Sequence, residues 1–340
     1  MNKTQLKELK TVLSQAQNIV IVPHKNPDGD AMGSTLALNH YLSELGHDAN
    51  VIVPNDYPNF LKWLPGDDSV LIFENDQDKA EGLIHEASLI FTLDFNALHR
   101  AGEMLNSLEA STATKIMIDH HQQPDDYAKY MYSDVSMSST CEMVYNFIEQ
   151  LGDLEKVNSD IATCLYTGIM TDTGSFRFPS TTSRTHDVVS QLIAKGANNS
   201  EIHNKVFDTN RYSRLQLLGR AMQNLKVIPE LFTSYITLSQ DELDEFNFKK
   251  GDTEGFVNYG LSLKGIVFAA IFIENKQDDI IKISLRSKGE FSVNEFSRAH
   301  FNGGGHTNAA GGRSHESLEA TVDKFISILP QYKEQLSPKQ

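Results

Sequence analysis

Cysteine is scarce in this chain of 340 residues, which contains only Cys141 and Cys164. Both lie in apolar segments with a helical pattern, so we expect them to be plain core residues in a reducing compartment. This argues against a disulfide framework and against a cysteine-rich zinc site. We expect a cytoplasmic protein.

Long hydrophobic runs are also missing. Runs such as Ile19–Val22 and Ile266–Ile273 are much shorter than the roughly 20 apolar residues that a helix needs to cross a bilayer. The N-terminal sequence has an amphipathic helical pattern without the apolar core and small-residue cleavage site of a secretion signal. We therefore expect neither a membrane anchor nor secretion.

Positive charge is in short supply. The chain has 30 Lys and Arg residues against 45 Asp and Glu residues, which gives a formal net charge of −15. Binding of long nucleic acids depends on clustered basic residues, so we expect a small anionic substrate and no long duplex. Part of the acidic excess is consistent with a metal site, because a cage of carboxylates is neutral only when its cations are counted.

The chain is long enough for two domains, since single cores rarely grow beyond about 250–300 residues. Its first part alternates short β-branched runs with helical patterns, which predicts a doubly wound α/β domain with a parallel sheet. The expected strands are Asn18–Val22, Asn50–Val53, Val70–Phe73, Leu89–Leu93 and Lys115–Ile118. The expected helices are Asp30–Leu45, Ser139–Leu151, Ser159–Met170 and Ser183–Lys195.

The second part predicts a smaller α+β domain. We assign residues 1–195 to the first domain, 196–228 to a helical linker and 229–340 to the second domain. The expected elements of the second domain are strands at Phe232–Leu238, Val267–Ile273 and Ile280–Leu285, a helix from Gln240 and a final helix at Leu318–Leu329.

Three polar residues follow the first expected strand. His24, Asp28 and Asp30 crowd one strand-to-helix turn. A structural interpretation is open, because Asp28-Gly29 is an ordinary turn dipeptide and Asp30 can cap a helix. A calcium loop of the EF-hand type is excluded, because Met32 and Asn39 occupy its fifth and twelfth positions.

Further ligand types follow the later strands. Asp94 ends the fourth strand, and Asp119, His120 and His121 end the fifth. In an open parallel sheet the carboxyl ends of the strands meet at one edge, so these side chains are expected to lie together. Asp172 follows an apolar helical pattern and is either a turn residue or a further ligand.

The combination of ligand types favours hard divalent cations. It comprises four carboxylates and two imidazoles without a thiolate, from His24, Asp28, Asp30, Asp94, His120 and Asp172. Mn²⁺ fits best, with Mg²⁺ or Co²⁺ possible. Two such ions about 3.5–4 Å apart can hold a bridging hydroxide and clamp a phosphoryl oxygen for in-line attack. The residues therefore predict metal-dependent hydrolysis of a phosphoester.

Read together, these motifs closely resemble the DHH phosphoesterase superfamily. Its motifs occur in order as HKNPDGDAMGS at 24–34, the single acid Asp94, the triplet at Asp119–His121, and Asp172. In the second part, FNGGGHTNAAGG at Phe301–Gly312 resembles the GGGH motif of the DHH-associated domain. The resemblance thus covers both predicted domains.

The resemblance implies roles for these residues. One metal ion would be bound by His24, Asp28 and Asp94, and the other by Asp30, Asp94, His120 and Asp172, with Asp94 bridging. Asp119 would orient the neighbouring histidines. His121 would face the phosphate, where it hydrogen-bonds a phosphoryl oxygen or protonates the leaving oxygen.

In the second domain, the resemblance implies that Gly303, Gly304, Gly305 and His306 bind the substrate, through backbone N–H groups that no side chain obstructs. A flexible glycine turn is the competing interpretation. Arg286 ends an apolar strand and either binds a terminal phosphate or is simply solvated.

Within the superfamily, the chain most resembles the two-domain enzymes that hydrolyse oligoribonucleotides of a few residues to 5′-mononucleotides and remove the 3′-phosphate of 3′-phosphoadenosine 5′-phosphate. The alternatives are a phosphodiesterase of cyclic-di-AMP or linear dinucleotides, a pyrophosphatase or exopolyphosphatase, and a nucleotide sensor without activity. The sequence leaves the choice between a monomer and a homodimer open.

Overall fold

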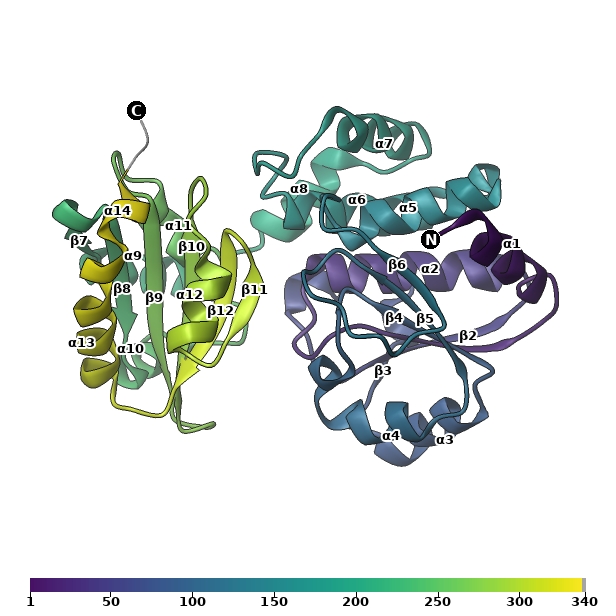
Figure 1. The fold of residues 1–340 in the computed structure, drawn as a ribbon, viewed down its shortest axis with the longest axis horizontal. Helices are drawn as coiled ribbons and strands as arrows, with labels where there is room; N and C mark the ends of the chain where they lie inside the picture. The colour runs from purple at the N-terminus through teal and green to yellow at the C-terminus, as the bar shows by residue number, and fades with distance from the viewer. Residues whose placement is uncertain (338–340) are drawn as a thin grey trace. The chain divides into compact units, whose positions relative to one another are not determined.

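A computed structural model describes residues 1–337 and divides the chain into two compact units, Met1–Thr209 and Asn210–Gln340 (Figure 1). The division falls inside the range 196–228 assigned to a linker, between α8 (Asn199–Phe207) and α9 (Tyr212–Gln223). The three domain ranges given above stay a prediction.

The first unit contains a sheet of six strands in the order β3-β2-β1-β4-β5-β6. Every neighbouring pair is parallel, which confirms the predicted doubly wound architecture. The order reverses between β1 and β4, and ligands of such sheets bind beyond the carboxyl ends at this point. The strands are β1 (Asn18–Val22), β2 (Asp48–Val53), β3 (Leu71–Ile72), β4 (Leu89–Leu93), β5 (Thr114–Asp119) and β6 (Tyr130–Ser133).

Helices cover both faces of this sheet because its strands are apolar on both faces (Figure 1). In β1, Ile19 and Ile21 belong to one core and Val20 and Val22 to the other. The first core is shared with α1 (Lys3–Val12), α2 (Gly29–Glu44), α5 (Thr140–Leu151), α6 (Ser159–Asp172), α7 (Ser183–Ala194) and α8. The second is shared with α3 (Gln77–Glu86), the 3-10 helix η3 (Leu98–Met104) and α4 (Leu105–Ala110).

Glycines allow α2 and α6 to approach closely. A Cβ atom on Gly33 of α2 would lie 2.5 Å from the Cys164 carbonyl oxygen of α6, and one on Gly168 of α6 would lie 3.1 Å from the Asp30 Cα atom of α2. Both cysteines are buried and free, as the sequence predicts. This packing brings Asp172, the last residue of α6, towards the start of α2.

The second unit contains a mixed sheet in the order β11-β12-β10-β9-β8-β7, in which only β8 and β9 pair in parallel. Its strands are β7 (Lys226–Ile228), β8 (Thr233–Leu238), β9 (Phe268–Asn275), β10 (Ile280–Ser287), β11 (Gly304–His306) and β12 (Ala309–Ser314). The glycine-rich stretch thus forms a hairpin rather than a flexible turn.

Alternation along β9 again separates two cores. Phe268 and Phe272 face an aromatic core that contains α12 (Val293–His300), α13 (Leu318–Ile328) and α14 (Lys333–Leu336). Ile271 and Ile273 face α9, α10 (Gln240–Glu245) and α11 (Phe256–Leu261). Period-two burial of this kind is what a sheet covered on both faces requires.

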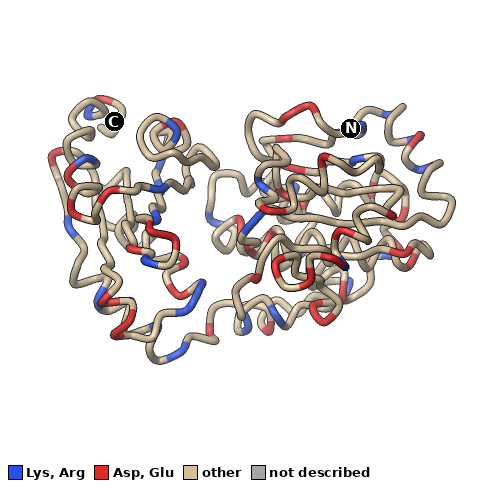
Figure 2. Tube along the Cα trace, turned by 90° about the horizontal axis from the view of Figure 1, so that it is seen from below, with Lys and Arg blue, Asp and Glu red and all other residues tan. Residues whose placement is uncertain are grey.

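Acidic positions are spread along both units (Figure 2). Among residues 1–337, no helix combines the length and the apolar character needed to span a bilayer.

Candidate metal centre

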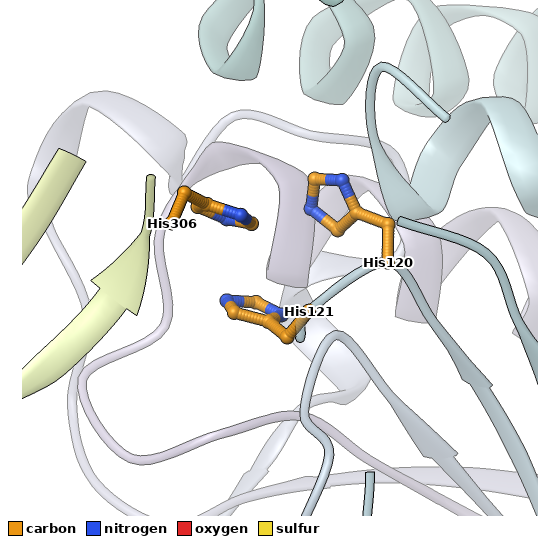
Figure 3. Close-up of side chains that lie close together, drawn as sticks. All are labelled: His120, His121 and His306. Atoms are coloured by element: carbon orange, nitrogen blue, oxygen red, sulfur yellow. The ribbon is translucent and has the colours of Figure 1, made fainter. Parts of the chain in front are cut away.

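The predicted ligands converge at the carboxyl edge of the first sheet. His24 follows β1, Asp28 is the N-cap of α2 and Asp30 lies in its first turn, while Asp94 follows β4. His120 and His121 follow β5, and Figure 3 shows their two rings. Asp172 ends α6. Segments far apart in the sequence therefore supply one cluster, as the convergence of parallel strands predicts.

One group consists of His24, Asp28 and Asp94, whose ligand atoms lie within 4.8 Å of one another. The His24 Nε2 atom lies 3.4 Å from Asp94 Oδ2. The other ring nitrogen, Nδ1, donates to the carbonyl oxygen of Lys25 at 2.9 Å. This bond selects the tautomer that leaves Nε2 as the lone-pair donor for a cation.

A second group consists of Asp30, His120 and Asp172. His120 Nε2 lies 3.8 Å from Asp30 Oδ2 and 3.5 Å from Asp172 Oδ2. His120 Nδ1 donates to the Met137 carbonyl oxygen at 3.2 Å, so this ring also directs Nε2 into the cluster.

Asp94 lies between the two groups. Its Oδ2 atom faces His24, and its Oδ1 atom lies 3.6 Å from His120 Nε2. The residue has φ 63°, and its N–H donates to the Ile118 carbonyl oxygen at 3.1 Å. The Thr140 hydroxyl donates to Oδ1 at 3.0 Å. A strained, tethered backbone at such a position is typical of a functional residue.

Asp30 is held by the start of α5, which sequence reasoning did not place at the site. Its carboxylate accepts from the backbone N–H groups of Thr140 at 2.6 Å and Cys141 at 2.9 Å. The positive end of a helix stabilises an anion there. Ser139 caps α5, so its sequence signals a helix start but not which carboxylate the helix will contact.

Several carboxylates are buried close to one another in the cluster, and they shift the pKa values of their neighbours. Burial raises the pKa of Asp30 well above its ordinary value, and the charges of Asp94 and Asp172 raise it further. Burial also acts to raise the pKa of Asp94, but contacts with His120 and His24 outweigh it and hold the pKa well below its usual range. Burial acts to lower the pKa of both histidines, but the carboxylates raise it. Divalent cations would relieve this carboxylate repulsion.

Asp119 is fully buried and contacts His121. Its Oδ1 atom accepts from His121 Nδ1 at 2.7 Å, and its Oδ2 atom accepts from the His121 backbone N–H at 3.1 Å. These two bonds fix the orientation of the His121 ring. The orienting role assigned to Asp119 stays a prediction.

The second unit carries the remaining predicted residues. The Gly305 N–H donates to the Asn294 side-chain oxygen at 3.1 Å, and Gly305 has φ 149°. Arg286 lies on β10 opposite Ala309 and donates to the Leu285 carbonyl oxygen at 3.0 Å. Gly303 precedes β11, Gly304 begins it, and His306, labelled in Figure 3, ends it. Sequence reasoning missed Asn294, because nothing local marks it as a partner of the glycines.

Two protein families match the two parts of the chain separately. Residues 18–169 match the DHH family, N-terminal domain, and residues 230–335 match the DHHA1 domain. A bifunctional oligoribonuclease and PAP phosphatase NrnA from Bacillus subtilis is 29% identical over 95% of this chain and 96% of its own length. The protein of the same name from Thermus thermophilus is 31% identical over 86% of this chain and 83% of its own.

A solved structure, an exopolyphosphatase-related protein from Bacteroides fragilis, is 41% identical with a TM-score of 0.94 over 98% of each chain. Family membership and the donor set together indicate an enzyme that depends on divalent metal ions. The chain belongs to the DHH family, in the form that carries a DHHA1 domain, and is a hydrolase acting on phosphoester bonds.

Proposed function

We propose that the enzyme hydrolyses short oligoribonucleotides to 5′-mononucleotides and removes the 3′-phosphate of 3′-phosphoadenosine 5′-phosphate. The observation that carries this proposal is Asp94, whose two carboxylate oxygens face different histidines, His24 and His120. A carboxylate shared in this way suits a pair of cations acting on one phosphate. The substrates are those in the names of the Bacillus subtilis and Thermus thermophilus relatives.

The donor set fits two hard divalent ions, and we propose Mn²⁺. His24, Asp28 and Asp94 would hold one, while Asp30, Asp94, His120 and Asp172 would hold the other. When bound, such ions acidify water and neutralise phosphoryl charge. The polypeptide contributes the buried carboxylates and the ring orientations described above, which need little rearrangement to receive cations.

His121 is the proposed hydrogen-bond or proton donor to the substrate. Its Nδ1 atom donates to Asp119, which fixes the orientation of the ring that would meet a phosphoryl or leaving oxygen. In the second unit, Arg286, Gly303, Gly304, Gly305 and His306 are proposed to bind the nucleotide. Backbone N–H groups of glycines suit a phosphate or a base edge, because no side chain obstructs them.

The proposal is tested with purified protein and Mn²⁺ on a panel of substrates: a 5′-phosphorylated dinucleotide, 3′-phosphoadenosine 5′-phosphate, cyclic-di-AMP, pyrophosphate and long RNA. We expect turnover of the first two. Turnover of pyrophosphate alone would contradict the proposal, and a strong preference for cyclic-di-AMP would favour the dinucleotide phosphodiesterase alternative. Tight nucleotide binding without turnover would indicate a sensor.

A further inference from the structure

Thr140, the first residue of α5, contacts two of the proposed metal ligands at once. Its side-chain hydroxyl donates to Asp94 Oδ1 at 3.0 Å, and its backbone N–H donates to Asp30 Oδ2 at 2.6 Å. The residue is fully buried. Asp94 follows β4 and Asp30 lies in the first turn of α2, so one residue of α5 links carboxylates that come from two other segments.

Buried threonines in the interior of helices of the first unit use their hydroxyls differently. Thr35 donates to the Ala31 carbonyl oxygen of α2 at 2.9 Å, and Thr167 donates to the Thr163 carbonyl oxygen of α6 at 2.8 Å. Such bonds satisfy the hydroxyl within its own helix. Thr140 has no preceding helical turn, so its hydroxyl is directed out of the helix, and its acceptor belongs to the carboxylate cluster.

The start of α5 is itself anchored by contacts outside the cluster. Glu142, which is 2% exposed, accepts from the hydroxyl of Ser138 and, at 3.0 Å, from that of Thr185 in α7. The Ser139 side chain caps the helix by accepting from the Glu142 N–H at 3.0 Å. The backbone of Thr140 is therefore held by groups that are not proposed ligands, and its hydroxyl has a fixed origin.

The orientation of the Asp94 carboxylate decides whether it can serve two cations. Its Oδ2 atom lies 3.4 Å from His24 Nε2, and its Oδ1 atom lies 3.6 Å from His120 Nε2. Rotation about the Cβ–Cγ bond would move both oxygens away from these histidines. Rotamer preference does not prevent this rotation, because the terminal torsion of an aspartate is broad. A hydrogen bond to one of the two oxygens does prevent it.

We propose that Thr140 is a positioning residue of the metal centre, whose hydroxyl fixes the Asp94 carboxylate in the orientation that presents one oxygen to each of two ions. The inference rests on the ligand assignment of the proposed function and deepens it, because it makes α5 responsible for the alignment of the bridge. Thr140 binds no ion itself and acts through Asp94. Its backbone N–H restrains Asp30 in addition, and a change of side chain leaves that N–H in place.

The first experiment measures Mn²⁺ binding by calorimetry for the wild type, Thr140→Val and Thr140→Ser. Valine has the shape of threonine without the hydroxyl, so Thr140→Val should weaken the binding of at least one ion about 10- to 100-fold, the usual loss when a partner of a metal ligand is removed. Thr140→Ser keeps the hydroxyl and should retain most of the affinity. Thr35→Val is the matched control and should bind Mn²⁺ as the wild type does, because Thr35 is equally buried and its hydroxyl bonds to its own helix.

The second experiment records the electron paramagnetic resonance spectrum of each protein at saturating Mn²⁺. Two ions that share a carboxylate are magnetically coupled, and the coupling depends on the geometry of the bridge. We expect Thr140→Val to alter the coupled spectrum or to replace it by that of isolated ions, and Thr140→Ser to restore it. A role of Thr140 in packing alone would leave the spectrum unchanged. Circular dichroism checks that each variant is folded, and Thr140→Ala compared with Thr35→Ala replaces the valine pair if Thr140→Val is unfolded.

Wild-type Mn²⁺ affinity together with a wild-type spectrum in Thr140→Val would overturn the inference. An equal loss in Thr35→Val would overturn it as well, and so would an equal loss in Thr140→Ser, since that result assigns the effect to the methyl group. Fewer than two bound ions in the wild type would refute the two-ion centre of the proposed function, and the inference with it. Two ions in the wild type and an unaffected Thr140→Val would refute the role of Thr140 alone, so the two failures are distinguishable.

Discussion

The two units bury polar groups in opposite ways. The first unit concentrates them, because Asp30, Asp94 and Asp119 are at most 2% exposed and lie together with His120 and His121. The second unit disperses them, and several of its buried polar side chains bond to neighbours within the same unit. Asn294, for example, accepts from Gly305 and from Arg298, and Ser297 donates to the Gly311 carbonyl oxygen.

The difference follows from sheet topology. A parallel sheet sends all its carboxyl ends to one edge, so residues after β1, β4 and β5 converge there. The second sheet is mixed, so its strand ends are distributed over both edges, and aromatic packing dominates instead. The ring centroid of Phe325, for instance, lies 5.5 Å from that of Phe268 and 5.1 Å from that of Phe272. We therefore expect a substitution in one unit to leave the stability of the other unit largely unchanged.

The largest effect is expected from Asp94→Ala. Losing the carboxylate that faces both histidines should lower turnover by about 10³-fold or more, because metal-based charge stabilisation is worth several kcal/mol. Turnover and Mn²⁺ stoichiometry are the measurements, and at least one ion should be lost. Asp126→Ala, which removes an exposed carboxylate, is the control. Full activity in Asp94→Ala would exclude a bridging role.

Gly303→Ala should destabilise the second unit. The new Cβ atom would lie 1.9 Å from the Gly311 carbonyl oxygen, so the hairpin must shift, at a cost of about 1–3 kcal/mol in unfolding free energy. Hydrogen exchange should show lost protection in β12, with Mn²⁺ affinity unchanged. At Gly304 the nearest atom would be 3.5 Å away, so Gly304→Ala should be close to neutral in stability. Equal destabilisation by both would refute the packing argument.

The affinity of the first unit for Mn²⁺ should depend on pH, because two of the proposed ligands are histidines. The raised pKa of His24 and of His120 means that the metal-free protein keeps these protons above the ordinary histidine range. A proton must leave before the ring can bind a cation, so affinity should fall as pH decreases from the raised pKa, by up to about tenfold per pH unit for each displaced proton. Calorimetry in two buffers measures proton release. Constant affinity between pH 6 and 8 would contradict this linkage.

The smallest effect is expected from Glu242→Gln in the second unit. Burial acts to raise the pKa of Glu242, but bonds from Asn224, Ser239 and Arg220 outweigh it and lower the pKa. Because the pKa of Glu242 is lower in the folded than in the unfolded protein, its carboxylate stabilises the fold at pH values above the unfolded-state pKa. This stabilisation is lost as the pH falls through the folded-state pKa. The substitution should cost about 1 kcal/mol near neutral pH and nothing in acid, measured by urea unfolding at both.

Exposed Glu319, in the first turn of α13, offers the matched control. Glu319→Gln should leave the unfolding free energy of the second unit nearly unchanged at either pH. A pH-independent cost of Glu242→Gln would show that its contribution is packing and not charge.

Much of the first unit followed from local patterns. The bounds of β1 and β4 are those predicted, and α2 and α5 begin within one residue of the prediction. The short β6 and the helices α3 and α4 were not expected. Strong alternation and caps identify long elements, whereas a four-residue edge strand has too little pattern of its own.

The amino-acid sequence by itself determined which residues are chemically able to bind cations, and the topology of a parallel sheet explained why they should meet. Only the tertiary structure decided what surrounds them. The amides of Thr140 and Cys141 on Asp30, and the hydrogen bond from the Lys25 N–H to the Arg100 carbonyl oxygen, join segments with no local signal for each other. Such contacts depend on how helices and loops pack after folding, so residue spacing cannot specify them.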